Sequence, residues 1–201
     1  MEPTAPHTLW LIRHGETEWS ASGRHTGRSD IPLTAEGQHQ AVTLGRHLGG
    51  RRFAQVLTSP LSRAAETCRL AGYGDVARST DDLREWDYGI YEGRTTADIR
   101  KEIPGWSVWT GEIREGESAE QVGARARRVI AQAQAAPGDV ALFAHAHVLR
   151  ILTACYLGLS PRDGRRFALG TASISILGYE RETPALITWN QDWHLVREEA
   201  P

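Results

Sequence analysis

The sequence predicts an α/β fold built around a mostly parallel sheet. Short apolar segments of the kind that form buried strands alternate with longer segments whose apolar residues recur at helical spacing. Capping residues and glycines mark where several of the helical segments begin or end. Because strands separated by helices usually pair in parallel through right-handed crossovers, this alternation favours a sheet of mostly parallel strands.

Apolar runs bounded by polar or glycine-rich sequence define the expected strands. The first run, at 9–13, stays apolar until it meets an abrupt Arg-His-Gly. The remaining strands are predicted at 53–58, 139–144, 173–179 and 185–189, the last two as a closing pair. Between the first strand and the first long helix, residues 15–33 are polar and predict a loop.

Capping signals define the expected helices. Thr34 is a typical N-cap residue, and Ser118 with Gln121 has the spacing of a capping box. Ser59 followed by Pro60 predicts a helix with serine as its N-cap and proline at the first helical position. The predicted helices span about 35–48, 60–72, 96–102, 119–136 and 148–157.

Between 72 and about 117 the sequence is irregular and rich in aromatic residues. Five aromatic side chains of the whole chain either line a pocket for a sugar or aromatic group, or pack in the core and under a covering segment: those of Trp19, Trp86, Tyr91, Trp106 and Trp109. Packing is the commoner use of aromatic residues, and a covering segment, or lid, is expected at about 83–117. The aromatic residues are Trp86, Tyr88, Tyr91, Trp106 and Trp109.

Length and composition bound the class of protein. A chain of 201 residues, with 40% hydrophobic and 24% charged residues, is expected to form a single domain over 1–201. The net charge of −2 provides no general attraction for nucleic acid or an anionic membrane. Any positive charge that binds an anion must therefore be gathered locally. Cys68 and Cys155 lie in apolar helical patterns and are expected to be packed thiols.

The N-terminal sequence carries no targeting signal that we recognise. Residues 1–8 are polar and lack a basic n-region, and the apolar run at 9–12 is too short for a signal peptide or a membrane span. We therefore expect a cytoplasmic protein that has neither a membrane nor a nucleic acid as its partner.

Basic residues follow three of the predicted strands. Arg13 and His14 end the first strand, Arg63 comes just after the second, and His145 and His147 follow the third. Ligands of open α/β sheets bind beyond the carboxyl ends of the strands, where these side chains would meet. The convergence predicts an anion site.

Each of these groups also has a plainer interpretation. Arg63 lies in the first turn of its helix, where the macrodipole disfavours a cation. An arginine at such a position is expected where a site requires it. An ordinary surface arginine remains the alternative. His14, His145 and His147 could together hold a metal ion. The neighbouring arginines would repel that cation, whereas they would assist a phosphate clamp. We therefore favour the clamp and expect no metal.

A phosphate ester that is hydrolysed needs an acid to protonate its leaving oxygen. Glu85 is an attractive candidate, because apolar Leu83 and Trp86 beside it would favour the protonated carboxyl. This argument separates it only weakly from Glu92. The acidic residues considered are Asp81, Asp82, Glu85, Asp87 and Glu92.

Several ordered blocks resemble the signatures of the histidine phosphatase superfamily, in the branch that contains phosphoglycerate mutase. The blocks are LIRHGET at 11–17, TGRSDIPLT at 26–34, TSPLSRAAET at 58–67, LREWDYGIYEG at 83–93, GES at 116–118 and FAH at 143–145. Their order and spacing follow the family from residue 9 to about 180. The resemblance implies a three-layer α/β/α sandwich with a mostly parallel central sheet, as in the phosphoglycerate mutases.

The resemblance also implies roles for individual residues. His14 would be the nucleophile that is phosphorylated, while Arg13, Arg63 and His145 would hold the non-bridging oxygens. Glu85 would protonate the leaving group and then activate water. No cofactor or metal is implied. Further contacts to the phosphate or substrate are expected from Ser20, Thr26, Gly27 and Ala146.

Two departures from the family pattern bear on these expectations. The family usually has glycine where this chain has Ala146, a change that is tolerated if the residue has a negative φ. Mutases carry a longer, basic insertion with paired arginines between Glu85 and Ser118, whereas this segment is short and aromatic. We therefore favour hydrolysis over phosphoryl return to a substrate.

The expected activity is metal-independent hydrolysis of a small phosphorylated metabolite through a phosphohistidine. The closest resemblance is to actinobacterial acid phosphatases and sedoheptulose-bisphosphatase-like members, which suggests a broad-specificity acid phosphatase or a sugar phosphatase. The alternatives are a cofactor-dependent phosphoglycerate mutase and a non-catalytic phosphate- or phosphoprotein-binding relative. Family members form dimers, so a homodimer is a candidate assembly.

Overall fold

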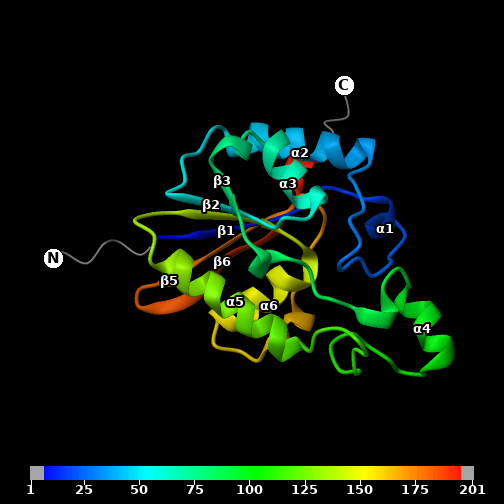
Figure 1. The fold of residues 1–201 in the computed structure, drawn as a ribbon. Helices are drawn as coiled ribbons and strands as arrows, with labels where there is room; N and C mark the ends of the chain where they lie inside the picture. The colour runs from blue at the N-terminus through cyan, green and yellow to red at the C-terminus, as the bar shows by residue number, and fades with distance from the viewer. Residues whose placement is uncertain (1–6, 196–201) are drawn as a thin grey trace.

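A six-stranded sheet in the order β3-β2-β4-β1-β5-β6 forms the centre of the protein (Figure 1). The computed structural model describes residues 7–195, so most of the polar N-terminal sequence at 1–8 lies outside the described residues. The strands are β1 Leu9–Arg13, β2 Gln55–Thr58, β3 Ala77–Ser79, β4 Val140–Ala144, β5 Ile174–Glu180 and β6 Thr183–Gln191. Strands β3, β2, β4 and β1 pair in parallel, while β5 pairs antiparallel with both β1 and β6. The sheet is thus mostly parallel, as predicted.

Helices cover both faces of this sheet (Figure 1). On one face α2 and α3 pack over a cluster that includes Ile12, Leu44 and Phe143, and on the other α5 and α6 pack over a larger cluster. The α-helices are α1 Glu18–Ala21, α2 Ala35–Leu48, α3 Ser62–Leu70, α4 Thr96–Glu102, α5 Ala119–Gln134 and α6 Ala146–Tyr156. The 3-10 turns are Gly74–Val76, Asp81–Leu83, Gly89–Tyr91, Pro161–Arg166 and Trp193–Leu195. The predicted three-layer sandwich is confirmed.

The start of α3 differs from the prediction. Leu61, not Ser59, is the N-cap residue, and α3 begins at Ser62. The Ser59 hydroxyl lies instead 2.8 Å from His145 Nε2 and accepts the backbone N–H of Leu61 at 3.3 Å. The serine therefore contacts the site beyond the sheet, and the helix starts two residues later than predicted.

Two short elements were not predicted. Helix α1 interrupts the expected loop at 15–33, where Thr17 and Ser20 form a capping box. Strand β3 extends the parallel sheet at its edge, although only Ala77 in it is partly buried. Neither element has an apolar face long enough to produce a periodic sequence signal.

The aromatic residues of the lid are core residues. Trp86, Tyr88, Tyr91, Trp106 and Trp109 are each less than 10% exposed and belong to the cluster beneath α5 and α6. The lid segment with α4 lies beside α1, off one end of the sheet (Figure 1). Packing of the aromatic side chains holds the lid against the domain, so the lid forms a fixed wall.

Among the described residues, no helix is long and apolar enough to cross a membrane. The cysteine thiols are free, with Cys68 buried and Cys155 partly buried. The apolar run at 9–12 forms most of β1 in the middle of the sheet.

Candidate active site

His14 lies where β1 leaves the sheet. Its backbone N–H donates to Ala144 O of β4 at 3.0 Å, and its side chain is 5% exposed. Nδ1 lies 2.7 Å from the carbonyl oxygen of Gly15, which can only accept, so Nδ1 carries the proton. In the neutral ring this leaves the lone pair on Nε2. The tautomer suits attack through Nε2 on an electrophile.

The surroundings keep the His14 imidazole neutral. Burial lowers its pKa well below the ordinary value of 6.5, and the charges of Arg13 and Arg63 lower it further, although the Gly15 carbonyl opposes the shift. A neutral imidazole is the form that acts as a nucleophile. The same arginines would attract the phosphoryl group that the imidazole attacks.

Arg13 presents an unused donor to this region. Its Nη1 donates to Leu169 O at 2.5 Å, but its Nε is buried and has no hydrogen-bond partner among the described residues. Burial lowers the pKa of Arg13 to about 10. A buried guanidinium donor without an acceptor is costly, so this atom favours an anionic ligand.

Arg63 and His145 form the support behind His14. Arg63 Nε donates to His145 Nδ1 at 3.1 Å, which places the His145 proton on Nε2, beside the Ser59 hydroxyl. The His145 ring lies 5.1 Å from the His14 ring, centroid to centroid. Arg63 and His145 are both fully buried. Their predicted contact with non-bridging oxygens stays a prediction, because in this structure they bind protein groups.

Arg63 also fixes the loop at 26–29. Its Nη1 donates to Ser29 O, and its Nη2 donates to the carbonyls of Thr26 and Gly27, at 2.9, 3.0 and 3.1 Å. From the other side, Glu92 accepts the N–H groups of Gly27 and Ser29. Gly27 is required here because a Cβ would lie 2.5 Å from Trp86 O. Glu92 is thus a structural carboxylate of this loop.

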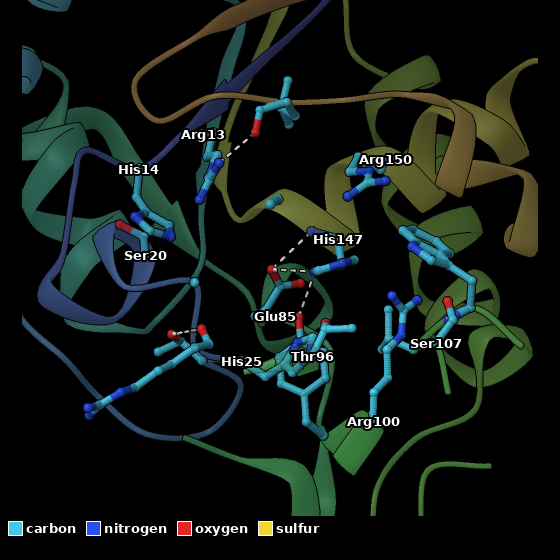
Figure 2. A pocket seen from close by; sticks show the side chains of 18 residues that line it. Arg13, His14, Ser20, His25, Glu85, Thr96, Arg100, Ser107, His147 and Arg150 are labelled. Atoms are coloured by element: carbon cyan, nitrogen blue, oxygen red, sulfur yellow. Dashed lines mark hydrogen bonds and ion pairs between the residues drawn. The ribbon is translucent and has the colours of Figure 1, made fainter. Parts of the chain in front are cut away.

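Glu85 is held at the start of α6. Its carboxylate accepts three backbone N–H groups, from Trp86 at 2.8 Å, Val148 at 2.9 Å and His147 at 3.0 Å. Figure 2 shows the carboxylate beside His147, whose Nδ1 lies 2.7 Å from the Tyr88 hydroxyl. Glu85 reaches the cavity wall, whereas Glu92 does not. The structure therefore favours Glu85 over Glu92 as the acid, a choice that the sequence supported only weakly.

Arg125 positions Glu85 and was not predicted. Its guanidinium donates to the backbone carbonyls of Asp82, Arg84 and Glu85, and it forms an ion pair with Glu117 at 3.0 Å. The side chain is buried although it comes from α5. In the sequence, Arg125 lies between Val122 and Val129 on the apolar face of the predicted helix. A charged residue on an apolar face indicates a buried partner, and our sequence analysis overlooked this signal.

These groups surround a cavity of about 410 Å³ (Figure 2). Three of the predicted site residues do not line it: Gly27, Arg63 and His145. The predicted residues on the wall are Arg13, His14, Ser20, Thr26, Glu85 and Ala146. The wall also holds His147, a candidate for the phosphate clamp, and Trp109, a candidate pocket aromatic. The wall residues that we had not assigned to substrate binding are Arg24, His25, Tyr88, Thr96, Arg100, Ser107 and Arg150.

Two predicted contacts depend on local backbone geometry. Ala146 begins α6 and does not have a positive φ, so its methyl group is accommodated as expected. Ser20 lies on the wall, but its hydroxyl accepts the Thr17 N–H and donates to the Thr17 carbonyl within α1. Its contact with a phosphoryl group stays a prediction. Among residues 7–195, no group of three or more His, Cys, Asp or Glu side chains is arranged to hold a metal ion.

The electrostatics predict that His14 stays neutral in moderate acid. Its lowered pKa means that the folded protein takes up this proton only well below pH 6.5. In ¹⁵N-histidine-labelled protein, the His14 ring signals, assigned by their loss in His14→Ala, are expected to show the neutral Nδ1–H tautomer at pH 6. A His14 titration centred near pH 6.5 would contradict this account.

The fold and the site together define an α/β protein that holds a neutral histidine among arginines, an arrangement suited to phosphoryl transfer. A model of the histidine phosphatase superfamily (branch 1) matches residues 9–192, and the chain belongs to this family.

The relatives that the chain resembles include proteins named as phosphatases. The chain is 43% identical over 178 residues to an acid phosphatase of Mycobacterium tuberculosis, covering 87% of each chain. It is 36% identical over 182 residues to the sedoheptulose 1,7-bisphosphatase of Saccharomyces cerevisiae, covering 74% of this chain and 67% of the relative. The solved structure of a Mycobacterium tuberculosis open reading frame product matches with a TM-score of 0.86 and 40% identity, covering 92% of this chain and 97% of that one.

Proposed function

We propose that this protein hydrolyses phosphomonoesters of small metabolites through a phosphohistidine at His14, without a metal ion. The observation that carries the proposal is the state of His14. A carbonyl oxygen fixes its proton on Nδ1, its pKa is depressed, and its ring lies on the wall of an arginine-rich cavity. Family membership and similarity to an acid phosphatase and a sugar bisphosphatase support hydrolysis.

The first half-reaction transfers the phosphoryl group to the enzyme. His14 Nε2 attacks phosphorus, and the new P–N bond forms as the P–O bond to the leaving alcohol breaks. The Glu85 carboxyl group gives a proton to the departing oxygen. Arg13 Nε and the N-terminal turn of α6 at Ala146 hold the phosphoryl oxygens.

The second half-reaction releases phosphate. Water attacks phosphorus, the Glu85 carboxylate takes a proton from that water, and the P–N bond breaks. Inorganic phosphate leaves, and both His14 and Glu85 return to their starting states. Arg63 and His145 support His14 from behind and complete the positive surroundings as the transferring group moves.

Two further expectations belong to the proposal. A small phosphorylated metabolite is the partner we infer, because the cavity of about 410 Å³ is of the size that holds a small molecule. We also propose that the protein acts in the cytoplasm, a proposal supported by the place of the apolar run at 9–12 in the central strand β1.

Hydrolysis of p-nitrophenyl phosphate with excess EDTA, from pH 4 to 9, tests this function. We expect activity that EDTA does not lower, since the proposed chemistry needs only protein side chains. Loss of activity on chelation, restored by adding a divalent metal, would overturn the metal-independent route. Absence of hydrolysis at every pH would return the mutase and the binding-protein alternatives to first place.

A further inference from the structure

The cavity has more positive charge than one phosphoryl group requires. Its wall carries Arg13, Arg24, Arg100 and Arg150, and Glu85 is its one carboxylate. None of these four arginines forms an ion pair with a carboxylate within residues 7–195. The charge of Glu85 acts on Arg13 and Arg150 without a direct bond to either, because its oxygens accept backbone N–H groups.

The charged groups fall into two sets (Figure 2). Arg13, His14 and Ser20 lie together on one side of the cavity, where the proposed chemistry occurs. Arg100 and Arg150 lie on the opposite side, beyond His147. A phosphoryl group bound at His14 would engage the first set and leave the second without an anion.

The protein holds the Arg150 side chain in one orientation. Its Nε donates to Gly164 O at 3.1 Å and its Nη2 donates to Arg165 O at 3.2 Å. The guanidinium carbon lies 4.6 Å from the centre of the Trp109 ring, which covers one face. Nη1 takes part in neither bond. The side chain is thus pre-oriented, with one donor group left for a ligand.

Arg100 comes from the lid. Its Nε donates to Trp106 O at 2.8 Å, a bond that leaves both terminal nitrogens of the guanidinium for another acceptor. Figure 2 shows the side chain extending from α4 toward the same space as Arg150. Two arginines from separate elements, the lid and α6, therefore converge on one part of the cavity.

The electrostatics agree with this placement. Burial lowers the pKa of Arg150, and the charge of Arg150 in turn lowers the pKa of Arg13 and of His147. The positive charge of Arg150 therefore repels that of Arg13 across a shared cavity. A second anion would relieve that repulsion.

We propose that Arg100 and Arg150 form a second anion subsite, which binds a phosphate or carboxylate at the far end of the substrate while its scissile phosphate lies at His14. This inference rests on the proposed phosphatase function and specifies its substrate class as phosphate esters with two anionic ends. Charge-assisted, bidentate contacts to a guanidinium suit either anion.

Three six-carbon substrates test the subsite. Fructose 6-phosphate has one anionic end, fructose 1,6-bisphosphate adds a distal phosphate, and 6-phosphogluconate adds a distal carboxylate. We expect kcat/KM for at least one doubly anionic substrate to exceed that for fructose 6-phosphate by about 10-fold or more, the value of one charge-assisted hydrogen bond. The preferred substrate identifies the distal group as phosphate or carboxylate.

Variants of the subsite should remove this preference. Arg150→Gln and Arg100→Gln are each expected to lower the ratio of kcat/KM values toward 1, with a much smaller loss on p-nitrophenyl phosphate. Arg162→Gln removes the same charge from the exposed pair with Glu120 and should keep the ratio. If Arg150→Gln lowers the melting temperature, Arg100→Gln provides the test of the subsite, because Arg100 is exposed and its replacement is expected to leave the fold intact.

The outcomes separate the two proposals. Equal kcat/KM values for all three substrates in the wild type, or equal losses on all of them in the variants, would overturn the second subsite while p-nitrophenyl phosphate hydrolysis still supports the phosphatase. Failure to hydrolyse p-nitrophenyl phosphate would overturn the proposed function itself, and the subsite inference with it.

Discussion

His14→Ala is expected to lower kcat for p-nitrophenyl phosphate by about 10⁴-fold or more. The variant removes the nitrogen that forms the P–N bond. His145 is not placed to replace it, because its Nδ1 accepts from Arg63 and its Nε2 lies on the Ser59 hydroxyl. The residual rate would come from the arginines alone. Steady-state kinetics at substrate saturation measure the effect.

A matched variant separates chemistry from folding. His39→Ala removes a histidine of the same size from the exposed side of α2, and its kcat should remain within about twofold of the wild type. Comparable melting temperatures for the two variants would confirm that the fold is intact. Substantial activity in folded His14→Ala would mean that the nucleophile is another group.

Glu85→Gln is expected to have the second largest effect, and its size should depend on the leaving group. The Gln side-chain oxygen can accept the N–H groups of Trp86 and Val148, although its NH2 group cannot accept that of His147. The amide also cannot supply a proton to a departing alkoxide. We expect kcat to fall about 10²- to 10⁴-fold for an alkyl phosphate such as a sugar phosphate. The loss should be much smaller for p-nitrophenyl phosphate, whose leaving group needs no proton.

The same comparison guards against a structural explanation. A variant that merely loosened the Glu85 loop would slow both substrates to the same degree, so equal losses would contradict the role of acid. Glu120→Gln, on the exposed surface of α5, controls for loss of a carboxylate and should leave both rates near those of the wild type.

The fold was predictable where the sequence is periodic. Strand β4 is buried along its length and β1 along most of it. Their apolar runs are unambiguous, so the ends of these strands and the basic residues beyond them could be located. Strand β3 could not, because it is short and mostly exposed. Its register follows from pairing with β2, which is a tertiary effect.

The catalytic candidates were predictable from position, since His14 follows β1 and His145 follows β4, which are paired neighbours. The residues that hold these catalytic candidates in place were not predictable from position. Arg125 and Arg63 bind backbone carbonyls of segments far away in the sequence, and any residue type can offer a carbonyl. Ser59 looked like a helix cap because its competing partner, His145, is 86 residues away.

The two arginines of the proposed second subsite were hidden for the same reason. Arg100 lies in a short lid helix and Arg150 one turn into α6, so they are not adjacent in sequence as a paired-arginine motif would be. Packing of Trp109 against Arg150 is one of the tertiary contacts that bring the lid and α6 together around one cavity, as is the contact of Tyr88 with His147. The proposed second subsite is therefore assembled by tertiary contacts and has no contiguous sequence motif.

Detection of the phosphoenzyme tests the central claim most directly. Wild-type protein mixed with a ³²P-labelled substrate and quenched within milliseconds in alkali should carry label on His14, because a phosphoramidate survives alkali and is lost in acid. The label should be absent from His14→Ala and should decay at a rate no slower than turnover. Hydrolysis at the full rate with no labelled His14, or label on another residue, would contradict the phosphohistidine mechanism.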